Sequence, residues 1–505
     1  MSSSQTYDCI VIGAGYAGLA AAKALKEANK TVLLIEARDR VGGRAKTIQL
    51  GSHSHAADAD EGVMDRSTTT STASSSGVGL NYWDVGASFL GPRQLRMHAL
   101  CKEFNINTFK TPREGDLVCN YRGKAQRYGN PDRPPFRLWE QADLALFIRR
   151  FEKLSETIDV EEPWKTPNAA SLDKVTAREW FAKQLWTKAG MDIANMSMES
   201  TLGTSSSVVS LLHTLFYFKS NGSLTEALRT EDGAQSHLIV GGGQAIANMV
   251  HEYLGEEVVR LGEPVEAVQQ DEHGVRVTTT KGSYQARKLI VATPPLHVLK
   301  MRFSPPLPTE KTVLLGQMPM GAYMKAFATY KTRFWADKGL RGELTSPSGF
   351  VCVTFDPTLP DSVVNAPGDN NNNKSPPGRS QPPPSRTFKM MGFICGSKAR
   401  EFVGYSPEER MRIVLGEFAA AFGEEALEPE EFYLHTMMDE EWAGGCPVAH
   451  PLPGMWTALG QWLRKPVGQI HWAGTETATR FNGYMEGAVL SGERAAGEVL
   501  EGLGA

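Results

Sequence analysis

The chain has 505 residues, of which 41% are hydrophobic and 22% are charged, and its formal net charge is −4. This composition is that of a soluble globular protein, and the near-neutral charge argues against a nucleic-acid or acidic-membrane partner. At about 150 residues per domain the length predicts roughly three domains, or two that are interleaved.

The sequence carries no sign of export, membrane insertion or metal binding. No run of about 20 apolar residues is present, and the first residues lack the basic and apolar regions of a signal peptide. Six scattered cysteines show neither metal-ligand spacing nor the density of a disulfide scaffold. We therefore expect a cytoplasmic protein with no metal site. No anchoring tail follows the last predicted helix, so no membrane anchor is expected either.

The first elements predict a βαβ unit. Residues 7–12 are predicted as a buried strand, 16–28 as an Ala-rich helix and 31–36 as the next strand. Gly13, Gly15 and Gly18 lie in the connecting turn, where they permit a tight turn, a close approach of the backbone to a pyrophosphate and close helix–strand packing. Glu36 ends the second strand and would accept hydrogen bonds from ribose hydroxyls. Together these features predict a dinucleotide site.

The residues after Glu36 favour FAD over NAD. Arg38, Gly42, Gly43 and Arg44 add a glycine pair between arginines, an extension that a simple nicotinamide site does not need. Arg44 can pair with pyrophosphate, and the glycine pair lets the backbone lie against a long cofactor.

Later segments divide into regular and irregular stretches. Residues 236–305 are predicted to return to the αβ pattern, with strands at 275–280 and 288–292, and the last helix is expected from 485 to about 500. Residues 52–80 and 361–386 are polar and lack apolar periodicity, so both are expected to be disordered surface insertions.

Eight further segments make the chain resemble the flavin amine oxidases, and specifically the soluble, microbial type of monoamine oxidase. The most specific of them is Trp472-Ala-Gly-Thr-Glu-Thr-Ala-Thr-Arg-Phe-Asn-Gly-Tyr-Met-Glu-Gly-Ala488. The others are residues 83–92, 241–244, 292–295, 303–308, 321–325, 391–393 and 492–496. The resemblance extends from about residue 7 to 500 apart from the two insertions.

This resemblance implies an α/β fold in which a Rossmann-type FAD-binding domain is interleaved with an α+β substrate domain, as in glutathione-reductase-like flavoproteins. The FAD-binding segments are expected at 1–100, 236–305 and 436–505, and the substrate segments at 101–235 and 306–435.

The resemblance also implies the cofactor contacts and the catalytic residues. The implied FAD contacts beyond the first turn are Gly86, Ala87, Ser88, Val265, Cys446, Gly474, Thr475, Tyr484 and Met485. Cys446 matches the cysteine that carries a thioether to the flavin in the animal enzymes, and covalent attachment stays open here. Lys325 matches the lysine that holds a water near flavin N5 and assists reoxidation by O₂. Tyr484 matches one wall of the aromatic cage around the amine.

The substrate side departs from the family pattern. Pro447 stands where the family has the second cage tyrosine, so the cage is either half open or completed by Trp442, Trp456 or His450. Ala227 falls where a bulky gating residue is common, which would enlarge the cavity, and Gln235 is a candidate polar pocket residue. Phe216 is a candidate for the pocket wall, although the aromatic run around it favours the core.

The predicted reaction is oxidation of a primary aliphatic amine, long or bulky if Ala227 opens the gate, to aldehyde, ammonia and hydrogen peroxide, with O₂ as acceptor. Polyamine oxidation and L-amino-acid oxidation are the alternatives within the superfamily. A non-enzymatic flavin-binding protein is the distant alternative, which Lys325 together with Tyr484 disfavours. Assembly into a homodimer stays open.

Overall fold

The computed structural model describes residues 6–49, 81–364 and 387–504. The predicted insertion at 52–80 lies outside these residues, as do residues 365–386 of the second insertion. Residues 361–364 differ from the expected disordered loop: they form helix α13 (Asp361–Val364). Val363 and Val364 pack against a hydrophobic cluster that includes Leu359, which explains the order at this end of the insertion.

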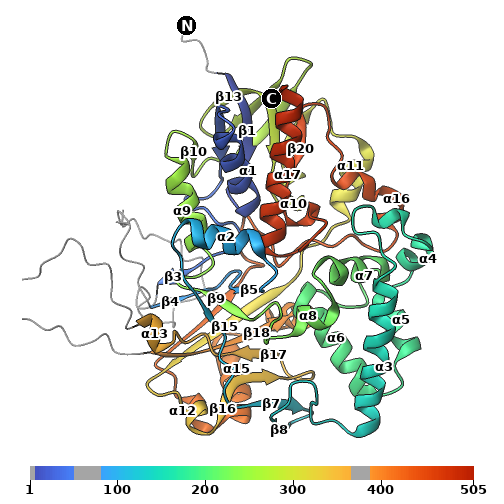
Figure 1. The fold of residues 1–505 in the computed structure, drawn as a ribbon, viewed down its shortest axis with the longest axis vertical. Coiled ribbons are helices and arrows are strands. Elements are labelled where there is room, and N and C mark those ends of the chain that lie inside the picture. Colours follow the sequence, from blue (N-terminus) through green and yellow to red (C-terminus); the bar gives the residue numbers. More distant parts are fainter. Residues whose placement is uncertain (1–5, 50–80, 365–386, 505) are drawn as a thin grey trace, which may run out of the picture.

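An eight-stranded sheet forms the upper part of the molecule in Figure 1, and its strands come from three distant parts of the chain. Its order is β10-β2-β1-β13-β12-β11-β14, with β20 paired to β13, and β1 lies parallel to β2, as a βαβ unit requires. The strands are β1 (Thr6–Ile12), β2 (Val32–Ile35), β10 (Val259–Arg260), β11 (Val265–Gln270), β12 (Val275–Thr279), β13 (Ser283–Val291), β14 (Arg302–Ser304) and β20 (Ile470–Trp472).

Helices from both ends of the chain cover this sheet. Helix α1 (Tyr16–Glu27) packs against the last helix, α17 (Met485–Leu503), and also contacts α9 (Ala245–Leu254). Gly492 of α17 permits this contact, since a Cβ there would lie 2.1 Å from the carbonyl oxygen of Ala17. The predicted first strand, first helix and last helix are therefore present within a few residues of their expected bounds.

A second, seven-stranded sheet lies below, in the order β19-β15-β18-β17-β16-β7-β8. Phe418 and Phe422 of helix α15 (Pro407–Phe422) belong to the hydrophobic core against one face of this sheet. The strands are β7 (Asp116–Tyr121), β8 (Lys124–Tyr128), β15 (Tyr323–Tyr330), β16 (Leu340–Thr345), β17 (Val351–Phe355), β18 (Phe388–Cys395) and β19 (Glu431–Thr436).

A layer of helices stands beside this sheet, at the right of Figure 1. It shares a core of leucine and aromatic side chains, Phe151, Phe181 and Phe216 among them. The helices are α3 (Leu138–Ser155), α4 (Ala169–Lys174), α5 (Ala177–Gln184), α6 (Lys188–Leu202), α7 (Leu211–Ser220) and α8 (Leu224–Leu228).

One strand departs from the predicted organisation. Strand β9 (His237–Ile239) pairs with β5 (Phe89–Leu90) and β6 (Thr108–Lys110) in a separate three-stranded sheet, and not with the large sheet. The remaining elements are β3 (Ile48–Gln49), β4 (Tyr82–Trp83), α2 (Leu95–Glu103), α10 (Pro295–Val298), α11 (Thr309–Gly316), α12 (Phe334–Asp337), α14 (Gly396–Phe402), α16 (Met455–Leu459) and short 3₁₀ turns at Pro163–Lys165, Glu424–Leu427, Gly460–Leu463 and Thr475–Thr477.

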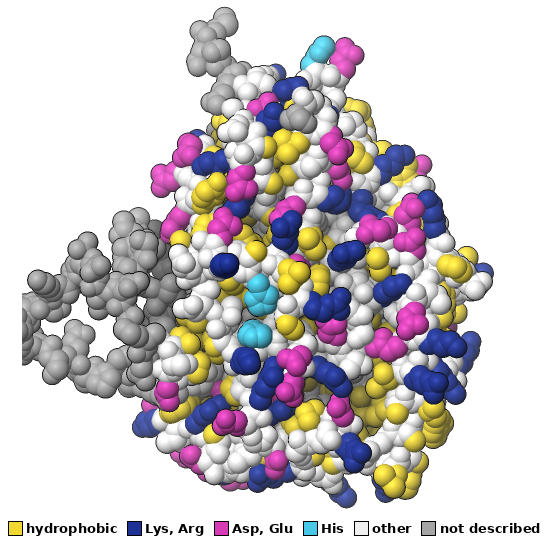
Figure 2. Space-filling model, viewed as in Figure 1, with side chains coloured by type: hydrophobic (Ala, Val, Ile, Leu, Met, Phe, Trp, Pro, Cys, Tyr) yellow, Lys and Arg dark blue, Asp and Glu magenta, His cyan; other side chains and the backbone are white. Residues whose placement is uncertain are grey.

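The surface is mixed in charge. Basic and acidic side chains are interspersed over the face drawn in Figure 2. None of the helices in the described part of the chain combines the length and apolarity needed to cross a bilayer. Over the same residues, no three His, Cys, Asp or Glu side chains gather as a metal site would require.

Candidate active site

A cavity of about 890 Å³ connects the two sheets. At one end it is lined by the turn after β1, including Gly13 and Gly15, and at the other by the second sheet, including Lys325 and Phe393. Its length therefore runs from the predicted dinucleotide turn to the predicted substrate domain.

The glycine turn has the geometry that the sequence predicted. Gly13 has a φ of +99°, which favours glycine, and a Cβ on Gly18 would lie 1.8 Å from the carbonyl oxygen of Gly13. Gly18 thus serves helix–strand packing and is not part of the cavity wall. The carboxylate of Glu36 accepts from the backbone N–H of Ala14 (2.7 Å) and of Arg38 (3.1 Å), which fixes it on the wall.

The two arginines after Glu36 are engaged differently. Arg44 donates to both carboxylate oxygens of Glu476, at 2.6 and 3.1 Å, and to the carbonyl oxygen of Pro447 at 2.7 Å. The pyrophosphate contact of Arg44 stays a prediction, and the structure adds a carboxylate partner, Glu476, that was not predicted. Arg38 is the freer donor: its Nη2 is buried, and no described residue supplies it with a hydrogen-bond partner.

A long dinucleotide fits this end of the cavity. The unpartnered Arg38 Nη2 offers a donor to a phosphate or sugar oxygen. A Cβ on Gly43, whose φ is +61°, would come within 3.1 Å of Gly15 Cα, so the two glycines keep the wall thin where a cofactor backbone would pass. Val265, at the start of β11, lines the same end. The predicted contacts Gly86, Ala87, Ser88, Gly474, Thr475 and Met485 all line the cavity.

Lys325 lies in β15 and lines the cavity, although only 8% of it is exposed. Its Nζ donates to the carbonyl oxygens of Asp84 (3.0 Å) and Gly86 (2.5 Å) and to Ser88 Oγ (2.6 Å). Burial lowers the pKa of Lys325 to about 8, and the nearby Asp84 carboxylate opposes that shift. The lysine is therefore fixed in place by three acceptors.

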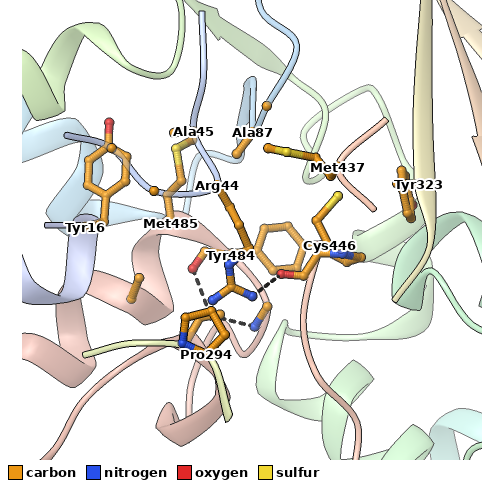
Figure 3. Close-up of a pocket in the computed structure, with 18 of the residues that line it drawn as sticks. Tyr16, Arg44, Ala45, Ala87, Pro294, Tyr323, Met437, Cys446, Tyr484 and Met485 are labelled. Atoms are coloured by element: carbon orange, nitrogen blue, oxygen red, sulfur yellow. Dashed lines mark hydrogen bonds between the residues drawn. The ribbon is translucent and has the colours of Figure 1, made fainter. Parts of the chain in front are cut away.

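Tyr484, Cys446 and Arg44 all line the cavity, and Figure 3 labels the three side chains. Tyr484 precedes α17, and its ring centroid lies 6.4 Å from that of Tyr217, which also lines the cavity. Tyr217 was not singled out from the sequence, where it sits within an aromatic run that indicated core. Burial raises the pKa of the Cys446 thiol to about 12, opposed by Arg44 and Lys325.

Two of the three side chains considered for the missing cage wall lie elsewhere. Trp456 Nε1 donates to His213 Nδ1 at 3.0 Å, and the other ring nitrogen of His213 contacts His450 Nδ1, also at 3.0 Å. Both Trp456 and His450 are thus buried in the helical layer and do not line the cavity. Trp442 does line it, next to His297. Pro447 itself forms part of the wall.

Of the other predicted pocket residues, two line the cavity and one lies in the core. Ala227 and Gln235 line the cavity, and Gln235 Nε2 donates to the carbonyl oxygen of Ala227 at 2.9 Å. Phe216 is 1% exposed, packs against Trp456 and is not part of the lining, so the core interpretation is the right one for this residue. On a helix, the side of α7 that holds Phe216 turns away from the side that holds Tyr217.

The chain is similar to known flavoenzymes over nearly its whole length. Residues 16–500 match the family described as flavin-containing amine oxidoreductase. A flavin-containing amine oxidase of Oncorhynchus mykiss is 34% identical over 508 residues, covering 100% of this chain and 88% of its own. Cyclohexylamine oxidase from Brevibacterium oxydans IH-35A has a TM-score of 0.85 at 29% identity, over 99% of this chain and 100% of its own. Putrescine oxidase bound to putrescine has a TM-score of 0.84 at 27% identity, over 98% of this chain and 99% of its own.

The two-sheet fold and the glycine turn define an FAD-dependent flavoprotein. More particularly, the chain belongs to the flavin-containing amine oxidoreductase family and is an amine oxidase. The distant alternative, a flavin-binding protein without enzymatic activity, is therefore wrong.

Proposed function

We propose that the protein oxidises a primary aliphatic amine to the aldehyde, with release of ammonia and reduction of O₂ to hydrogen peroxide. The observation that carries the proposal is that Lys325 and Tyr484 line the same cavity as the Gly13–Gly15 turn. A flavin bound along this cavity supplies the acceptor for two electrons from the amine carbon.

The residues of the chain then have separate tasks. The Tyr484 ring, partly buried beside Tyr217, offers an apolar face that orients the amine and excludes water. Lys325, held by three acceptors, presents a fixed positive charge where O₂ would be reduced. No carboxylate or imidazole needs to act as a strong base in this scheme.

Oxidation of L-amino acids is less well supported. A carboxylate substrate needs a cation to bind it, most often an arginine. The described arginines that line the cavity are Arg38, Arg44 and Arg302, and all three accompany the glycine turn or β14 on the cofactor side. Near Tyr217 and Ala227 the described lining contains no arginine.

Anaerobic mixing with amines tests the proposal. We expect primary alkylamines to bleach the flavin absorbance band, and peroxide to appear when O₂ is admitted. Bleaching by L-amino acids but not by alkylamines would overturn the proposed substrate class. Precipitating the protein in acid in the same preparation separates the two modes of attachment, because FAD joined to Cys446 stays in the pellet.

The size of residue 227 is expected to limit the length of the amine. In the variant Ala227→Leu, kcat/KM for long or branched amines should fall about tenfold relative to butylamine, because a larger side chain would fill the cavity where Ala227 lines it. Kinetics over a series of n-alkylamines measure this ratio, and FAD content verifies that the variant is folded. An equal loss for every amine would show that Ala227 does not set the length limit.

A further inference from the structure

One carboxylate lies in the part of the cavity that faces the second sheet. The other glutamates of the described lining, Glu36, Glu263 and Glu266, belong to the cofactor end, around β2 and β11. Glu343 instead comes from β16 and lies beside Thr345 and Thr230. The Glu343 side chain is 17% exposed, and a carboxylate that is largely removed from solvent needs hydrogen-bond or charged partners.

The partners of Glu343 leave one of its oxygens available. Arg341 Nη2 lies 2.8 Å from Oε2, and Thr230 Oγ1 donates to the same oxygen at 3.3 Å. No hydrogen bond from the described residues reaches Oε1. Burial raises the pKa of Glu343 above its usual 4.5, and the Arg341 guanidinium opposes that shift.

Gln235 supplies a second acceptor in the same region. Its Nε2 is bonded to the carbonyl oxygen of Ala227, while its Oε1 is buried and lacks a partner among the described residues. Gln235, Thr230 and Glu343 all line the cavity. An unpaired buried amide oxygen is costly, and a donor brought in by a ligand would remove that cost.

The strand register places this group far from the flavin end. Lys325 of β15 faces Phe393 of β18, Phe393 faces Val353 of β17, and Val353 faces Thr345 of β16. All four side chains line the cavity. Three strand spacings of about 4.8 Å separate Lys325 from Thr345, or about 14 Å in all. Glu343 precedes Thr345 by two residues and therefore lies on the same face of the sheet.

We propose that Glu343, with Gln235 and Thr230, forms a subsite for a second ammonium group at the far end of the substrate, so that the preferred substrates are long α,ω-diamines. An ammonium carries three donors and a positive charge. It can donate to Glu343 Oε1, to Gln235 Oε1 and to a lone pair of Thr230 Oγ1. A plain alkyl chain would leave both of the first two acceptors without a partner.

This inference rests on the proposed function, and its test separates the two. Steady-state oxidation of a series of α,ω-diamines is compared with that of n-alkylamines of equal length. The wild-type enzyme should prefer a long diamine over its matched monoamine. In Glu343→Gln, KM for that diamine should rise about tenfold to one-hundredfold with no comparable change for the monoamine, because a charged hydrogen-bond partner is lost.

Two further variants keep the result interpretable. Gln235→Leu leaves the Glu343–Arg341 pair intact and should raise KM for the diamine more than KM for the matched monoamine, by a smaller factor than Glu343→Gln does. Glu428→Gln removes an equal charge from an exposed position outside the cavity and should change KM for neither substrate. Equal losses for diamine and monoamine, or no wild-type preference for any diamine, would overturn the subsite while leaving amine oxidation intact. If no amine bleaches the flavin anaerobically, the proposed function itself fails.

Discussion

Replacing Lys325 with methionine is expected to slow reoxidation of the reduced flavin by O₂ about one-hundredfold or more, because removal of a single preorganised group that stabilises developing charge typically costs that much. Electron transfer to O₂ creates negative charge, and Lys325 holds a positive charge on the cavity wall with its Nζ fixed by Asp84, Gly86 and Ser88. Reduction of the flavin by the amine should change far less. Stopped-flow absorbance measures the two half-reactions separately.

The pH dependence provides an independent check on this role. Burial lowers the pKa of Lys325 to about 8, so the side chain is charged below that pH and neutral above it. The wild-type reoxidation rate should therefore fall as the pH rises through about 8. Lys325→Met should show no such inflection.

A matched control is available on the neighbouring strand. Lys389 of β18 is also buried, its pKa is also lowered to about 8 by burial, and its Nζ donates to the carbonyl oxygen of Tyr82. It does not line the large cavity. Lys389→Met should lower stability yet leave reoxidation near the wild-type rate. Equal slowing in both variants, or a wild-type rate in Lys325→Met, would contradict the assigned role.

The parts of the site that the sequence predicted are those with local causes. The turn from Gly13 to Gly18 and the acid at Glu36 lie within one βαβ unit, and each position is set by a backbone requirement that only a few residue types meet. Lys325 could be placed through its resemblance to a family motif. By contrast, β9 precedes the glycines at 241–243, and its pairing with β5 and β6 depends on residues more than a hundred positions away.

The substrate side depended on contacts that no local pattern records. Phe216 and Tyr217 are adjacent and equally hydrophobic in pattern, yet only Tyr217 lines the cavity, because the rotation of α7 decides which side chain faces it. Glu343 reaches the cavity through the pairing of four strands. The pairing of Arg44 with Glu476 was not predicted, because Glu476 lies 432 residues further along the chain.

That long-range pair carries the second large effect. Glu476→Gln should lower the free energy of unfolding by about 3–5 kcal/mol, the usual cost of leaving one member of a buried ion pair without its partner. The Glu476 side chain is 3% exposed. It accepts hydrogen bonds from Nη1 and Nη2 of Arg44 and from the backbone N–H of Ala449, the last at 3.3 Å. Arg44 in turn holds the carbonyl oxygen of Pro447. Loss of the pair should therefore also loosen the wall that Pro447 forms.

An exposed ion pair with the same N–O distance shows how much of the effect is due to burial. Lys165 and Glu162 are also 2.6 Å apart, but the Glu162 side chain is 41% exposed, so Glu162→Gln should cost no more than about 1 kcal/mol. Flavin release and tryptophan fluorescence during chemical unfolding measure the loss of unfolding free energy in each variant.

The stability that the Arg44–Glu476 pair provides should depend on pH. Burial acts to raise the pKa of Glu476, but Arg44 holds it below 4.5, so the stabilisation is present above pH 4.5 and is lost as the pH falls further. The difference in free energy of unfolding between the wild type and Glu476→Gln should therefore shrink as the pH falls below 4.5. A loss no larger than that of Glu162→Gln would mean that the Arg44–Glu476 pair contributes no more than a surface contact.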